Sequence, residues 1–226
     1  MHLVDKTVNL NVEGHTSLIQ KLVYSGIIDT LARCSAGPKY SSRERFTSFV
    51  KNFCDWDEHS KISLTHLVKF LELVRIPEFE KLRKFAYEKI DTWPDGAVIY
   101  IKDDPEYAEV LNLWPKDSQH KEPVEKLNLE SLTHLNLLWK LRNSIVHEMR
   151  KPGYAVESLR ILTPFYHQIN DEDSQKETWE LEYPPAFLNK LVCNGIQNLK
   201  KYCEENRLDP RKSFIFGTYW IEQLNL

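Results

Sequence analysis

Arg142, Asn143 and His147 have the residue types and the spacing to act together on one phosphate group. If the segment is helical, Asn143 and His147 stack four residues apart on one face, and Arg142 directly precedes them. An imidazole can take or give a proton, a guanidinium can hold the charge of a phosphorane, and the amide can orient either partner. Because RNA supplies its own nucleophile in the 2′-hydroxyl, this set predicts phosphodiester cleavage without a metal.

The surroundings expected for Arg142 leave two interpretations open. The helical period places it in an apolar stripe, where a guanidinium costs roughly several kcal/mol unless it is paired or faces a cleft. Arg142 could therefore hold substrate, with Lys140, Arg150 and Lys151 binding the RNA backbone. Alternatively, it could be a buried interface arginine in a non-catalytic dimerisation or interaction module. The stripe consists of Leu135, Leu138, Leu141, Ile145, Val146 and Met149.

The helix that carries these residues is predicted over Leu129–Lys151 and should stop at Pro152 and Gly153. Apolar residues at helical spacing predict further helices over residues 16–35, 42–53, 63–75 and 185–206, and one that begins at Pro77. Helices therefore provide most of the expected fold, and residues 129–151 form its central element.

Alternating apolar and polar residues predict a few short strands. One is expected over Val8–Val12, one over residues 97–101, a hairpin near residues 165–183 and a last strand over Phe214–Trp220. The predicted fold class is mainly α, a helical bundle with small β insertions, organised as one domain over residues 1–226.

Charge and composition restrict the function classes. The chain has 30 Lys and Arg against 33 Asp and Glu, a net charge of −3, so any contact with RNA must be local. Four widely spaced cysteines and the lack of a long apolar run predict reduced thiols, a cytoplasmic location and no membrane partner. Without a cysteine cluster, an H-E-x-x-H motif or a glycine-rich phosphate loop, we expect no metal and no cofactor.

The stretch from Leu141 to His147 resembles the R-polar-x-x-x-H motif of the HEPN superfamily, helical-bundle proteins that include many ribonuclease toxins and defence nucleases. The resemblance covers this one helix and matches Arg142, Asn143 and His147 position by position. It implies a homodimer whose two motifs share a cleft and cut RNA to a 2′,3′-cyclic phosphate. It further implies a toxin–antitoxin or phage-defence role, with an antitoxin or another regulatory protein as partner. Met149 replaces the tyrosine usual in the branch that pairs with nucleotidyltransferase antitoxins.

Overall fold

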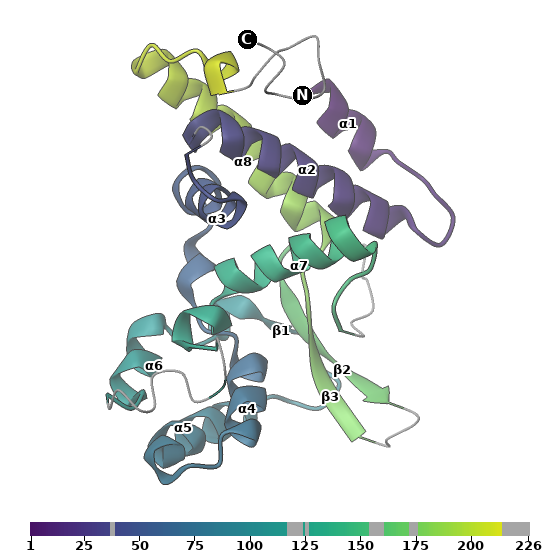
Figure 1. The fold of residues 1–226 in the computed structure, drawn as a ribbon. Coiled ribbons are helices and arrows are strands. Elements are labelled where there is room, and N and C mark those ends of the chain that lie inside the picture. Colours follow the sequence, from purple (N-terminus) through teal and green to yellow (C-terminus); the bar gives the residue numbers. More distant parts are fainter. Residues whose placement is uncertain (37–38, 117–123, 125–126, 154–160, 172–175, 214–226) are drawn as a thin grey trace. The chain divides into compact units, whose positions relative to one another are not determined.

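The computed structural model describes residues 1–36, 39–116, 124, 127–153, 161–171 and 176–213, which form two compact units (Figure 1). The first unit takes its residues from 1–56 and from 188 onward, and the second unit comprises residues 57–187. The prediction of a mainly helical chain with a small β portion is confirmed. The organisation as one domain stays a prediction, and the strand expected over Phe214–Trp220 lies outside the described residues.

Four α-helices build the first unit: α1 (His2–Val8), α2 (Thr16–Ala36), α3 (Ser42–Phe53) and most of α8 (Pro185–Glu205), followed by the short turn η6 (Pro210–Ser213). Helix α3 starts at a capping box, in which the Ser41 hydroxyl accepts from the Glu44 N–H and the Glu44 carboxylate accepts from the Ser41 N–H. Helix α8 packs on α3, and the Asn198 amide donates to the Phe53 carbonyl at 2.8 Å. The helices predicted over residues 16–35, 42–53 and 185–206 are confirmed within two residues of their ends.

The strand predicted over Val8–Val12 is wrong, because the chain there is the end of α1 and a turn. Helix α1 buries Val4 and Thr7, which are three residues apart, as helical spacing requires. The Gln20 amide donates to the carbonyls of Thr7 at 3.0 Å and Val8 at 3.2 Å, which satisfies the end of the helix. Three alternating apolar residues were too few to specify a strand.

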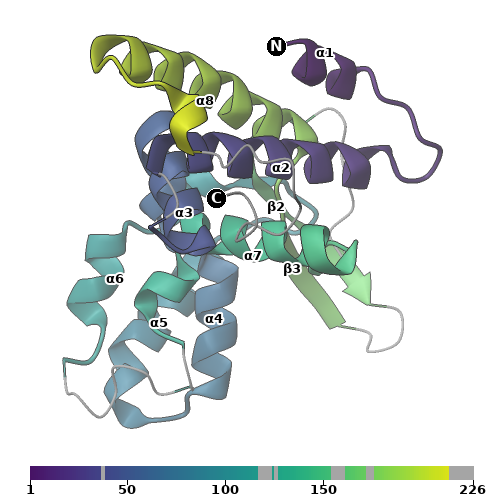
Figure 2. The ribbon, with the colours of Figure 1, turned by 45° about the horizontal axis from the view of Figure 1, so that its top comes forward.

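The second unit contains a helical group formed by α4 (Leu64–Leu73), α5 (Glu80–Ile90) and α6 (Tyr107–Leu113), which lie beside one another (Figures 1 and 2). Short turns precede α4 (η1, Asp57–Ser60) and α5 (η2, Pro77–Phe79), so the helix predicted to begin at Pro77 is confirmed with a 3-10 first turn. The rings of Phe70, Phe79 and Trp114 pack together with centroids 5.1–5.6 Å apart inside the apolar core of this group: Phe70 stacks on Trp114, and Phe79 lies edge-on to both.

A three-stranded antiparallel sheet in the order β1-β2-β3 completes the second unit with helix α7 (His134–Glu148). The predicted hairpin is confirmed as β2 (Phe165–Asp171) and β3 (Lys176–Glu182), with Tyr166 opposite Leu181. Strand β1 is only Ile99–Tyr100, shorter than predicted, because the chain turns into the 3-10 helix η3 (Ile101–Asp103). Phe165 and Tyr166 point to opposite faces, yet both are buried, so both faces of β2 are covered.

The helix predicted over Leu129–Lys151 is shorter at both ends. A 3-10 turn, η5 (Leu129–Leu132), comes first, and α7 is His134–Glu148. Thr133 has extended backbone angles and its hydroxyl accepts from the Asn136 N–H at 3.3 Å, so it caps α7. Met149 ends the helix in the left-handed conformation, with φ of 52°, before Pro152 is reached. None of the helices in the described part of the chain has the length and apolar content that a bilayer span requires.

Candidate functional site

Helix α7 brings the three motif side chains into one hydrogen-bonded group. The Arg142 guanidinium donates through Nη1 to Asn143 Oδ1 at 3.0 Å, and the same nitrogen lies 3.2 Å from His147 Nε2. Arg142 and Asn143 are half-buried, whereas His147 is exposed to solvent. The sequence predicted that these residues meet, and the arginine connects the other two.

The ring of Trp139 explains how α7 accommodates a guanidinium beside its apolar stripe. The Arg142 Cζ lies 5.0 Å from the centre of the Trp139 ring, one helical turn earlier. A planar cation over an indole face is favourable by about 0.5–2 kcal/mol. Within the stripe, Leu138, Leu141 and Ile145 are buried, so the apolar seam is confirmed in its centre and Arg142 lies at its margin.

The contact between Arg142 and His147 places one imidazole nitrogen within hydrogen-bond distance of the guanidinium. A guanidinium has only donors, so the contact is a hydrogen bond when His147 Nε2 carries no proton and offers its lone pair. A neutral imidazole is a base. The geometry therefore combines a proton acceptor, a fixed cation and an amide at an exposed end of α7.

The three cations predicted to bind RNA differ in their surroundings. Lys140 is exposed, lies three residues before Asn143 and seven before His147 on the same face, and forms no ion pair with a described residue. Arg150 pairs with Glu148, with 2.5 Å from Nε to Oε2. Lys151 Nζ lies 3.9 Å from the buried carboxylate of Glu182. Lys140 is thus the cation best placed beside the motif.

A buried polar network at the other end of α7 was missed by the sequence analysis. The Asp104 carboxylate is its centre: Oδ2 lies 2.7 Å from His134 Nε2 and 2.5 Å from the Tyr166 hydroxyl. His134 Nδ1 lies 2.8 Å from the Tyr183 hydroxyl, and Ser63 Oγ lies 2.9 Å from that of Tyr166. All five side chains are at most 4% exposed.

Burial determines the chemical state of the two phenols in this network. Burial and the neighbouring Asp104 carboxylate raise the pKa of Tyr166 well above its ordinary value, and the same two causes raise the pKa of Tyr183. Both hydroxyls therefore keep their protons at any physiological pH and can donate to Asp104 and His134. The network joins the residue before α4, strand β2, the residue after β3 and the residue after η3 to the first residue of α7.

Among residues covered by the structure, no three His, Cys, Asp or Glu side chains form a group that could hold a metal ion.

Comparisons of the chain with protein-family models, curated proteins and solved structures find no match. The geometry of the side chains on α7 is therefore the basis for a functional proposal.

Proposed function

We propose that the protein is a metal-independent endoribonuclease of the HEPN type, with Arg142, Asn143 and His147 as its catalytic residues. The observation that carries this proposal is the single hydrogen-bonded group of guanidinium, amide and imidazole on the exposed end of α7. These are the groups that cleavage by an internal 2′-hydroxyl needs: a base, and donors for the charge on phosphorus.

The cleavage step follows from the acidity and charge of the three groups. The RNA phosphate attracts Arg142, whose guanidinium then holds the two non-bridging oxygens and releases His147 Nε2. The free lone pair accepts the proton of the 2′-hydroxyl, the 2′-oxygen bonds to phosphorus, and the bond to the 5′-oxygen breaks. The products are a 2′,3′-cyclic phosphate and a 5′-hydroxyl end. The leaving 5′-oxygen takes a proton from a protonated imidazole, which His147 of a second copy of the motif in a homodimer would supply.

Lys140 extends the proposed site along the RNA. Its ammonium group lies on the face of Asn143 and His147, where it would contact a neighbouring phosphate. Arg150 and Lys151 would contribute to RNA binding only after exchange with their carboxylate partners. The resemblance to HEPN toxins extends the proposal to a cytoplasmic role in a toxin–antitoxin or phage-defence system, with an antitoxin or other regulatory protein as partner.

The test is cleavage of total RNA by the purified protein in excess chelator, with fragment ends analysed for a 2′,3′-cyclic phosphate. His147→Ala should lower the rate at least about 100-fold, because a positioned acid or base typically contributes that much or more. Arg142→Lys should also lower it, since a lysine cannot hold two phosphate oxygens by parallel bonds. The matched control is His167→Ala in β2, a histidine outside the motif, which should cleave like the natural protein.

Each result decides between the two functions considered. Cyclic-phosphate ends that depend on His147 and persist with chelator support the nuclease. If the natural protein leaves RNA intact while light scattering shows a folded dimer, the proposal fails and the non-catalytic dimerisation module becomes the better account. Equal loss of activity in the His167 and His147 variants would also contradict the assigned roles.

A further inference from the structure

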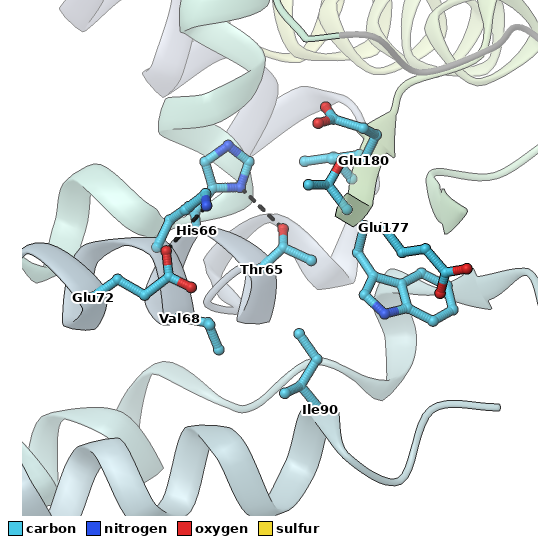
Figure 3. A pocket seen from close by; sticks show the side chains of 11 residues that line it. Thr65, His66, Val68, Glu72, Ile90, Glu177 and Glu180 are labelled. Atoms are coloured by element: carbon cyan, nitrogen blue, oxygen red, sulfur yellow. Dashed lines mark hydrogen bonds and ion pairs between the residues drawn. The ribbon is translucent and has the colours of Figure 1, made fainter. Parts of the chain in front are cut away.

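A cavity of about 250 Å³ lies between α4 and β3 in the second unit (Figure 3). Its walls come from α4, from Ile90 at the end of α5 and from residues 177–181 of β3. No residue of α7 lines it. The cavity is therefore a separate feature from the motif around His147.

The ionisable side chains that line the cavity are mostly acidic. Glu72, Glu177 and Glu180 contribute carboxylates, and the one lysine, Lys69, has its Nζ 3.0 Å from Glu72 Oε2. Figure 3 shows Glu72 and Glu177 on opposite sides of the cavity, with Val68 and Ile90 between them. The cavity thus has two separated carboxylates, of which Glu72 is paired with the exposed Lys69, and an apolar wall between them.

The imidazole of His66 adds no positive charge to this lining. Burial, and to a smaller extent the nearby His134, lower the pKa of His66 to about 4, so the ring is neutral at pH 7. Its Nδ1 lies 2.8 Å from Ser63 Oγ and 3.4 Å from Thr65 Oγ1. Its Nε2 has no hydrogen-bond partner among the described residues.

An indole ring completes the lining. Trp179 packs edge-on against Trp93, with centroids 5.1 Å apart and an interplanar angle of 84°, and Trp93 in turn contacts Tyr166 at 5.0 Å. The ring is thus held by its neighbours. Indole faces attract ammonium groups, and the apolar walls can cover the methylene groups of a chain.

We propose that this cavity binds a small linear aliphatic amine with two or three ammonium groups. One ammonium group would lie at Glu177 and another at Glu72, where it would share the carboxylate with the exposed Lys69 or replace it. The methylene chain would lie along Val68, Ile90 and Trp179. Nucleotides and other phosphorylated ligands are disfavoured by the excess of carboxylates. The volume is also just below the range of roughly 300–1,000 Å³ that larger ligands occupy.

Isothermal titration with spermidine at low salt tests the proposal. Binding should be saturable at one site and should weaken at least about fivefold in Glu177→Gln, which removes one cavity charge from an exposed residue and should not disturb folding. Glu204→Gln on α8 is the matched control, because it changes the net charge equally at an exposed residue outside the cavity. A neutral chain of similar length, 1,8-octanediol, should not bind.

Selective weakening in Glu177→Gln, with Glu204→Gln unchanged, supports the proposal. Equal weakening in both variants would identify attraction to an acidic surface and would overturn the proposal, as would the absence of spermidine binding to the natural protein. Circular dichroism of each variant shows whether it is folded. The readout is binding, so it does not depend on whether the protein cleaves RNA.

Discussion

Replacing Asp104 with asparagine should destabilise the second unit more than any other change of a single atom in the buried network. The Asp104 carboxylate accepts from three groups: the Leu64 N–H at 3.2 Å, His134 Nε2 at 2.7 Å and the Tyr166 hydroxyl at 2.5 Å. The residue is 3% exposed, so water cannot replace a lost partner. Asparagine has nearly the same shape but only one acceptor oxygen.

The size of the effect follows from these contacts. If the amide oxygen keeps His134 and Tyr166, the amide nitrogen faces the Leu64 N–H, and two donors oppose each other. Each hydrogen bond to a charged group contributes about 1.5–3 kcal/mol, and a buried group without a partner costs about 1–3 kcal/mol. The asparagine oxygen keeps the hydrogen bonds from His134 and Tyr166 in a weaker, uncharged form, while the bond from the Leu64 N–H is lost. We therefore expect Asp104→Asn to lower the free energy of unfolding by about 3 kcal/mol.

Urea unfolding measures this loss. With a slope of about 2 kcal/mol per M, a loss of about 3 kcal/mol lowers the midpoint of the second unit by about 1.5 M. Asp103→Asn is the matched control, since Asp103 is the adjacent residue, is exposed, and should change stability by less than about 0.5 kcal/mol. If the two variants have the same midpoint, Asp104 does not hold the network together and the reasoning is refuted.

Two other predictions concern stability. Gly195→Ala should destabilise the first unit by about 1–3 kcal/mol in thermal unfolding, because the added Cβ would lie 2.8 Å from the Phe49 ring. Gly26→Ala on α2, where the added Cβ meets open space, should stabilise the unit by up to ~1 kcal/mol. A loss of stability in both variants would contradict this packing. His66 has a folded pKa of about 4, below its unfolded value of 6.5, so its contribution to stability is present above pH 6.5 and is lost as the pH falls toward 4, by up to ~3 kcal/mol. His66→Gln should reduce the slope of stability against pH in this window, and His2→Gln, an exposed control, should not.

Several helices could be predicted because they bury a single apolar face. Helix α3 shows this most clearly: Phe46, Phe49 and Val50 are its buried residues, at the spacing that defined it in the sequence. The predicted ends of α7 were wrong because capping and backbone conformation, and not the apolar pattern, determine where a helix begins and ends. The Thr133 cap and the left-handed Met149 shorten α7 within a segment whose apolar pattern is continuous.

The candidate site could be predicted in part for a related reason. Arg142, Asn143 and His147 lie on one helix, so their separation depends on local geometry alone, and the structure brings them together. The Asp104 network could not be predicted, since Asp104, His134 and Tyr166 lie about 30 residues or more apart in the chain. No spacing rule relates them, and only the packing of the sheet and α7 places them in contact.

Helix α7 connects two polar groups: the buried network at His134 and the motif at Arg142 and His147. His134 is the first residue of the helix and is held on both ring nitrogens, by Asp104 and by the Tyr183 hydroxyl. Since successive residues turn by about 100°, two fixed contacts at one end set the direction in which Arg142 and His147 point at the other. Apolar residues of similar volume would cost less to bury, but they would permit the helix to rotate and slide. A site that must hold a base near a phosphate needs its supporting helix fixed to a fraction of an ångström, and directional hydrogen bonds in a dry core supply that constraint.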